Sequence, residues 1–161
     1  MTDIEALAPL PTGCRIERGS RADRARLRVW LQQTYQELLP QPPSLEAIAD
    51  LVDRLWTADA LLWWVFAASE VQPIAGLWLG WAIDPQTGAR QAQLLWLFVH
   101  PTHRRRGIAT ALIRLAEAAA HQRGCDLLGL QVDAHNPAAI GLYQSLGYVT
   151  RSLELVKSLD P

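Results

Sequence analysis

The chain has 161 residues, of which 50% are apolar and 19% are charged, and its formal net charge is −1. This length suits one domain with a buried core, and so small a net charge gives no field that would recruit nucleic acid or an anionic membrane. No apolar run approaches the roughly 20 residues that a membrane-spanning helix needs.

The N-terminal segment and the cysteines indicate the compartment in which the protein works. Residues 1–11 contain Asp3 and Glu5 and lack the basic n-region of a signal peptide. Cys14 and Cys125 are the only cysteines, and without an export signal we expect both thiols to be reduced in a cytoplasmic protein. We predict a loosely ordered tail over residues 1–12 and a single domain over residues 13–161.

The first third of the domain predicts one strand and two helices. Residues 14–17 form a short strand candidate. Ser20 with Asp23 three residues later matches a capping box, so a helix should run from there to about Leu39. Ser44 can cap a second helix. Its apolar stripe consists of Leu45, Ile48, Val52 and Leu55.

Three long strands should follow. Residues 61–68 and 74–83 are apolar runs rich in β-formers, and the short polar link between them suggests a hairpin. Residues 84–88 are a turn by composition. Residues 91–99 read as the third strand, and its end is apolar without alternation, which is typical of a strand covered on both faces.

A βαβ unit is predicted next. The helix should span residues 107–123, with Gly124 as its left-handed C′ residue and residues 127–132 as the following strand. A strand, a crossover helix and a second strand of these lengths make a βαβ unit, so we expect the two strands to be parallel. The helix has one apolar stripe, made of Ile108, Ala111, Leu112, Leu115 and Ala119.

The C-terminal part predicts a helix and a strand. Asn136 can cap the last helix, with Pro137 at its first position. That helix should end at Gly147, and residues 149–157 should form a final strand.

The segment from Val99 to Thr110 carries the chemistry. It lies between a buried strand and the start of a long helix, where unpaired N–H groups and the positive end of the dipole suit a phosphate. Gly107 has no Cβ and allows close approach of a ligand, and Ala109 is also small. The alternative is an ordinary helix start with a solvated basic turn.

Two rival phosphate-binding motifs fit poorly. A P-loop needs Lys followed by Ser or Thr after its last glycine, whereas Gly107 is followed by Ile108 and Ala109. A dinucleotide fold needs a glycine fingerprint after an early strand and an acidic residue about 20 positions later. The chain has one glycine at this point and too few βαβ units.

Two separated motifs resemble the GNAT superfamily of N-acetyltransferases. Residues 104–109, Arg-Arg-Arg-Gly-Ile-Ala, match the signature Arg/Gln-x-x-Gly-x-Gly/Ala, and residues 97–101 resemble the end of that family's fourth strand. Residues 136–148 resemble its Asn…Ala…Tyr…Leu-Gly-Phe/Tyr segment. The resemblance covers roughly residues 14–159. It implies an α/β fold with a mixed, mostly antiparallel sheet, a splayed parallel strand pair and flanking helices.

The resemblance also implies a site for acetyl-CoA as co-substrate and no metal. The pantetheine arm would bond to the main chain of Leu97, Phe98 and Val99, and Asn136 would lie near it. Tyr143 would face the coenzyme sulfur. Alternatively, Asn136 is a plain N-cap and Tyr143 a core residue. The amides that would hold the pyrophosphate belong to Arg104, Arg105, Arg106, Gly107, Ile108, Ala109 and Thr110.

The implied reaction is direct attack of a primary amine on the acetyl thioester. An amine with a pKa of about 10.4 must lose a proton first, at a cost above roughly 4 kcal/mol at pH 7. Many relatives place an acid on the fourth strand, but Leu95 and Trp96 stand there. The base is therefore unassigned. Candidates are Asp133, His100, His135 and Glu37.

The acceptor is an amine on a small molecule or a peptide, and its identity stays open, as does a homodimer. Because the strand acid is missing, a catalytically weak or inactive acyl-CoA-binding or sensing module on the same fold is an alternative. The chain also has 7 tryptophans. They either pack beneath the first two helices or line an aromatic acceptor pocket.

Overall fold

A computed structural model describes residues 9–159. It divides into two compact units, which meet in sequence between Gln131 and Val132, and each unit is described by itself below. Most of the predicted N-terminal tail, residues 1–8, lies outside the described residues. The organisation of residues 13–161 as a single domain remains a prediction. No helix within residues 9–159 is long and apolar enough to cross a membrane.

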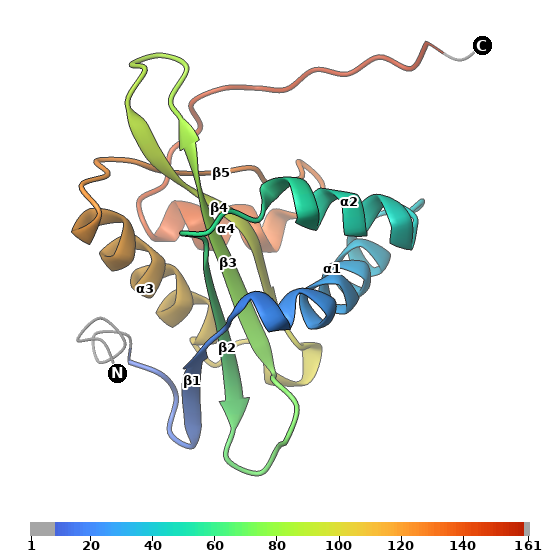
Figure 1. Ribbon diagram of the computed structural model, residues 1–161, viewed down its shortest axis with the longest axis vertical. Coiled ribbons are helices and arrows are strands. Elements are labelled where there is room, and N and C mark those ends of the chain that lie inside the picture. Colours follow the sequence, from blue (N-terminus) through green and yellow to red (C-terminus); the bar gives the residue numbers. More distant parts are fainter. Residues whose placement is uncertain (1–8, 160–161) are drawn as a thin grey trace. The chain divides into compact units, whose positions relative to one another are not determined.

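The first unit is built on a sheet of five strands in the order β1-β2-β3-β4-β5 (Figure 1). The first four strands are antiparallel to their neighbours, whereas β5 runs parallel to β4. This is the mixed sheet that the sequence predicts. The strands are β1 (Cys14–Arg18), β2 (Leu61–Ala67), β3 (Ala75–Ile83), β4 (Arg90–Val99) and β5 (Leu128–Leu130).

Helices lie on both faces of this sheet, with α1 and α2 on one side and α3 on the other (Figure 1). Two short 3-10 turns, η2 and η3, precede α1 and α3. The predicted helices are confirmed within one or two residues at each end. Their bounds are η2 (Arg21–Asp23), α1 (Arg24–Leu38), α2 (Leu45–Leu55), η3 (Pro101–His103) and α3 (Ile108–Gln122).

The predicted helix caps are present. The Ser20 hydroxyl accepts from the Ala22 amide at 3.2 Å, while the Ser20 amide donates to the Asp23 carboxylate at 2.8 Å. Ser44 caps α2 by accepting from the Ala47 amide at 3.1 Å. These bonds satisfy N–H groups that a helix start leaves without partners.

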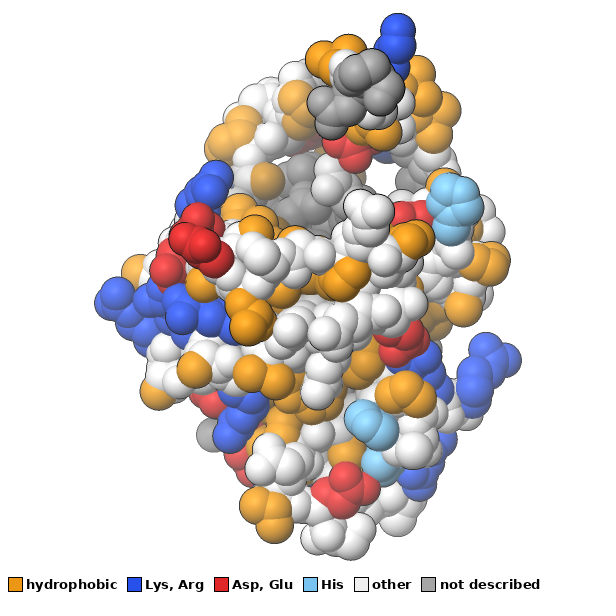
Figure 2. All heavy atoms as spheres, turned by 90° about the vertical axis from the view of Figure 1, so that its right-hand side faces the viewer, with side chains coloured by type: hydrophobic (Ala, Val, Ile, Leu, Met, Phe, Trp, Pro, Cys, Tyr) orange, Lys and Arg blue, Asp and Glu red, His pale blue; other side chains and the backbone are white. Residues whose placement is uncertain are grey.

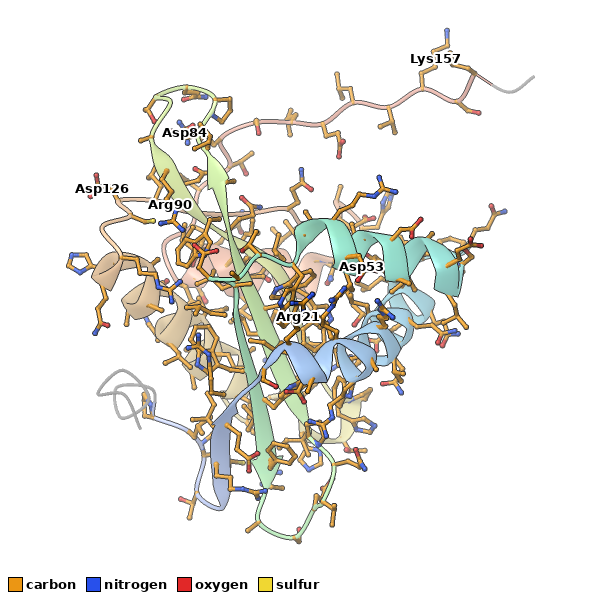
Figure 3. The ribbon with its side chains drawn as sticks, viewed as in Figure 1. Arg21, Asp53, Asp84, Arg90, Asp126 and Lys157 are labelled. Carbon is orange, nitrogen blue, oxygen red and sulfur yellow. The ribbon has the colours of Figure 1, made fainter. Side chains whose placement is uncertain are left out.

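Ion pairs join α1 and α2 to each other. Asp53, labelled on α2 in Figure 3, accepts from Arg28 at 2.9 Å and also pairs with Arg24. The α1 and α2 side of the first unit accordingly carries basic and acidic side chains close together (Figure 2). In the β3–β4 turn, the buried Asp84 accepts from the Gln86 amide and the Thr87 hydroxyl (Figure 3).

The core between the sheet and the first two helices is aromatic. Trp30 of α1 contacts Trp64, Trp96 and Phe98 edge-on or tilted, with ring centroids 5.6 to 6.1 Å apart. Most of these indoles are buried, so they fill the interior beneath the first two helices. The cluster contains Leu27, Trp30, Leu31, Ile48, Val52, Leu62, Trp64, Phe66, Trp78, Trp96 and Phe98.

One hydroxyl ties this aromatic core to α1. The Trp96 indole N–H donates to the Thr34 hydroxyl at 2.9 Å, and that hydroxyl donates to the Trp30 carbonyl at 2.8 Å. Thr34 is one of two buried polar residues within residues 9–159. This acceptor stabilises the buried Trp96 indole, because an unpaired buried N–H costs free energy.

The second unit contains α4 (Pro137–Ser145). Its predicted cap is present, since the Asn136 side chain accepts from the Ala139 amide at 3.2 Å. Gly147 follows the helix at a φ of 93°, a left-handed conformation that glycine adopts without strain.

The predicted strand over residues 149–157 is wrong. These residues form no strand, and Val149, Leu153, Leu155 and Val156 are each more than 80% exposed. A strand needs a hydrogen-bonded neighbour, and a pattern of strand-forming residues does not provide one. The strand predicted over residues 127–132 is also shorter than expected, because only Leu128, Gly129 and Leu130 pair with β4.

We predict that Thr34→Val destabilises the protein by about 1–3 kcal/mol, because the Trp96 indole loses its only described acceptor in the core. Urea unfolding followed by fluorescence measures this change. Thr34→Ser keeps the hydroxyl and is the matched control. Equal stability of the Val variant and the wild type would show that the hydroxyl contributes nothing.

Candidate active site

Strand β4 contains an irregularity at its centre. Trp78 of β3 pairs with Trp96, but the next residue, Leu79, pairs with Leu94, so Leu95 is an extra residue on β4. Such a β-bulge bends the strand and is common beside active sites. Gly80 makes room for it, since a Cβ there would come within 2.7 Å of the Leu95 side chain.

The two parallel strands separate just before this bulge. Strand β5 pairs with Ala92, Gln93 and Leu94 and with no later residue of β4. Within residues 9–131, the outer edge of β4 beyond Leu94 therefore has no strand partner. This splayed edge includes the predicted arm-binding residues, which are Leu97, Phe98 and Val99.

The loop that follows β4 has an unusual backbone. Arg105 has a φ of 62° and is the one non-glycine residue with positive φ among the described residues; Gly107 has a φ of 83°. A non-glycine side chain in this region is strained, and such strain is concentrated at functional sites. Both left-handed residues lie in the loop that enters α3, which begins at Ile108.

Helix α3 begins in this loop without a side-chain cap. Gly107 is its N-cap residue, and the first turn holds no acidic side chain. The amides of Ile108, Ala109 and Thr110 are at the positive end of the helix dipole and have no partner within the helix. A Cβ at Gly107 would meet no heavy atom within 4 Å. All seven predicted pyrophosphate-binding residues, 104–110, thus lie together at a helix start that suits an anion.

The three arginine side chains of the loop differ in their contacts with the rest of the first unit. Arg104 donates to the Val99 carbonyl at 2.8 Å and forms a two-point ion pair with Glu37 of α1. Arg105 and Arg106 are exposed. Sequence reasoning missed the Arg104–Glu37 pair because 67 residues separate its members and no pattern links them.

The loop also has a neighbouring hollow on the α1 side of the first unit. His103 Nε2 lies 3.0 Å from the Glu70 carboxylate, and the Thr102 hydroxyl lies between the Nδ1 atoms of His100 and His103 at 2.8 and 2.9 Å. These side chains line a cavity of about 360 Å³ together with Trp30 and other residues of α1.

Two predicted site residues belong to the second unit. Asn136 caps α4, which is the alternative role considered from the sequence. Tyr143 is buried, and burial raises the pKa of its hydroxyl to about 12. The hydroxyl is therefore protonated and can donate a hydrogen bond at any physiological pH. The coenzyme-binding roles of both residues remain predictions.

The candidate bases are engaged in other contacts. Both oxygens of Glu37 are held by Arg104, and His100 contacts Thr102. Hydrogen bonds from the His135 backbone and side chain lower the pKa of Asp133, which makes it a weaker base. On β4, Leu95 and Trp96 supply no carboxylate. The base stays unassigned.

Comparisons with curated proteins find acetyltransferases. The chain is 45% identical over 56 residues to one from Yersinia pestis (strain Pestoides F), covering 35% of this chain and 40% of the relative. It is 40% identical over 78 residues to one from Sodalis glossinidius, covering 48% and 54%. The chain thus spans about half the length of the curated relatives it matches.

Solved structures are similar over nearly the whole chain. A putative acetyl transferase from Pyrococcus furiosus has a TM-score of 0.76 at 21% identity, covering 91% of this chain and 99% of that one. An aminoglycoside 6′-N-acetyltransferase from Acinetobacter haemolyticus has a TM-score of 0.65 at 27% identity, with the same coverage. The first of these likenesses supports the fold alone.

The family model gives the broadest sequence match. It covers residues 25–148, which include α1 from its second residue, the splayed end of β4, the 104–110 loop and α4. Together with the splayed sheet and the uncapped helix start, this match shows that the chain belongs to the acetyltransferase (GNAT) family.

Proposed function

We propose that the protein is an acetyl-CoA-dependent N-acetyltransferase that acetylates a primary amine on a small molecule or a peptide. The observation that carries the proposal is that a chain of this family has both an open β4 edge and an uncapped helix start at Gly107. The edge offers main-chain groups to an amide-containing arm, and the helix start offers N–H groups to a pyrophosphate.

Two parts of the coenzyme would then be bound by the backbone. The main chain of Leu97, Phe98 and Val99 would bond to the pantetheine arm, and the amides of residues 104–110 would hold the pyrophosphate. Backbone groups are fixed by the fold, so little ordering entropy is lost when they bind. Asn136 would contact the arm, as the family resemblance implies.

The chemical step is a nucleophilic substitution at the acetyl carbonyl carbon. The neutral amine nitrogen bonds to that carbon, the carbon–sulfur bond breaks, and the electron pair leaves on the thiolate. A thiol pKa of about 8.5 makes this a fair leaving group, and the Tyr143 hydroxyl would stabilise it by a hydrogen bond. The amine proton leaves to water or to a base that is still unassigned.

The acceptor class rests on the amine chemistry of the family. The Acinetobacter haemolyticus enzyme, similar at 27% identity, is described as acting on an aminoglycoside antibiotic. Amino sugars therefore belong in a first acceptor panel, beside polyamines and peptide N-termini.

An acyl-CoA-binding module without turnover is the second candidate. It is favoured by the absence of an acid at Leu95 and Trp96, and by the lowered pKa of Asp133. Binding of acetyl-CoA with no acetylation of any amine across a wide panel and pH range would support this candidate over the enzyme.

We predict that acetyl-CoA binds with micromolar affinity at one site per chain, because both coenzyme-binding features belong to the same chain. Isothermal calorimetry on the purified protein measures the affinity and the number of sites. ATP is the control ligand. Clear binding of ATP without any binding of acetyl-CoA would contradict the proposed function.

We predict that Gly107→Ala lowers acetyl-CoA affinity roughly tenfold or more, because its Cβ would occupy space that the pyrophosphate approaches. The change also costs about 1–2 kcal/mol of stability, because the φ of 83° is strained for alanine. Gly88→Ala is the matched control. Gly88 has a φ of 71°, and its Cβ would also meet nothing within 4 Å.

The two alanine variants should therefore lose similar stability in thermal unfolding, while only the variant at Gly107 loses affinity. If both variants bind acetyl-CoA as tightly as the wild type, the loop does not hold the coenzyme.

We predict that Tyr143→Phe lowers kcat about 10- to 150-fold, because a hydrogen bond to a developing thiolate is worth roughly 1.5–3 kcal/mol. Coenzyme affinity should change much less, since the charge develops only in the transition state. Because the pKa of Tyr143 is raised to about 12, the wild-type rate should show no loss from its ionisation up to about pH 10.

Steady-state kinetics with the best acceptor of the panel measures these effects, and thermal unfolding provides the control. An unchanged kcat together with a lowered melting temperature would make Tyr143 a structural residue.

A further inference from the structure

Of the three loop arginines, Arg104 is the one whose side chain contacts β4 and α1. Its Nε donates to the Val99 carbonyl at 2.8 Å, and its Nη atoms lie 2.6 and 2.8 Å from the two oxygens of Glu37. Its guanidinium lies 5.3 Å from the centre of the Phe98 ring. The side chain is thus held by β4 and by α1 at once.

These contacts define which way the side chain points. The planar guanidinium presents its fork to Glu37 and lies over the Phe98 ring, and both oxygens of the carboxylate are used. A fork already matched to a carboxylate has its charge balanced locally. The side chain of Arg104 therefore contributes little as a phosphate ligand, although its amide remains available.

Arg105, which follows Arg104, has a strained backbone. Arg105 has a positive φ, which costs free energy for a non-glycine residue and is kept only where the surrounding structure enforces it. On the N-terminal side, the loop is fastened by Arg104 to Glu37 and by His103 to Glu70. On the C-terminal side, the backbone enters α3 at Gly107.

We propose that Glu37 is a positioning residue for the coenzyme. Acting through Arg104, it holds residues 104–107 in the conformation whose amides face the pyrophosphate, without touching the coenzyme itself. This inference rests on the proposed function. When the anchor is lost, Arg105 relaxes and the binding-competent conformation is less populated, so the apparent affinity falls by the same fraction.

If only the charge of Glu37 mattered, its removal would change acetyl-CoA affinity in the opposite direction. Acetyl-CoA is a polyanion, so removing a nearby negative charge should make it bind more tightly. The positioning role predicts weaker binding for Glu37→Gln, by roughly threefold to tenfold, because the neutral amide cannot hold the guanidinium fork. The direction of the change therefore distinguishes the two explanations.

Arg104→Lys gives a second test. It keeps the positive charge and removes the fork, so a charge-only role predicts unchanged affinity, whereas the positioning role predicts a loss similar to that of Glu37→Gln. Because both changes break the same contact, the double variant should be no weaker than the worse single variant.

Glu117→Gln is the matched control. It removes an equal charge from another partly exposed ion pair, that of Glu117 with Arg114 at 3.1 Å on α3. This pair lies about two turns beyond the helix start, so acetyl-CoA affinity should not change.

Calorimetry with acetyl-CoA and steady-state kinetics measure the effect. The expected result is a raised Kd and a raised KM for acetyl-CoA with an unchanged kcat at saturating coenzyme, in variants whose circular dichroism matches the wild type. Unchanged or tighter binding by Glu37→Gln would overturn the positioning role. Failure of the wild type itself to bind acetyl-CoA would instead overturn the proposed function.

Discussion

The first unit depends on a backbone constraint in β4. A strand inside a sheet normally pairs on both edges, because each unpaired N–H or carbonyl that is shielded from water costs free energy. Strand β4 pairs with β3 from Arg90 to Val99, apart from the bulge at Leu95, but with β5 only as far as Leu94. Beyond that residue, the strand has main-chain groups on its outer edge that β5 does not use.

Such an edge stays in place only because the rest of β4 is firmly held. One face of the strand is packed by the aromatic core under α1 and α2, and the other by the apolar stripe of α3. The Trp96–Thr34 bond fixes the first of these contacts at the level of the splayed end. A rigid scaffold of this kind positions the irregular functional loop that follows the strand.

Local sequence patterns predicted much of the fold and the position of the loop. The caps at Ser20 and Ser44, the stripe of α3 and the glycine at 107 are signals contained in a few neighbouring residues. They correctly gave the element order through α4 and the position of the loop. The resemblance to the family was needed to go from an anion site to a coenzyme.

Features that depend on distant partners could not be read in the same way. The strand-forming composition of residues 149–157 predicted a strand, but no neighbour pairs with it in the second unit. The hydrogen bond from Trp96 to Thr34 joins residues 62 positions apart. The ion pair of Glu37 with Arg104 joins residues 67 positions apart. The bulge at Leu95 depends on the register of β3, which no single strand encodes.

The attachment of the loop to α1 has a thermodynamic consequence. Since Glu37 lies on a helix and Arg104 on the loop, a molecule that binds more tightly to one position of α1 than to another also changes the conformational equilibrium of residues 104–107. Linkage then requires reciprocity: whatever factor a molecule bound at α1 imposes on the affinity of the loop for an anion, the anion imposes the same factor on the affinity for that molecule. The two binding events would be coupled through a helix, even where the bound molecules do not touch each other.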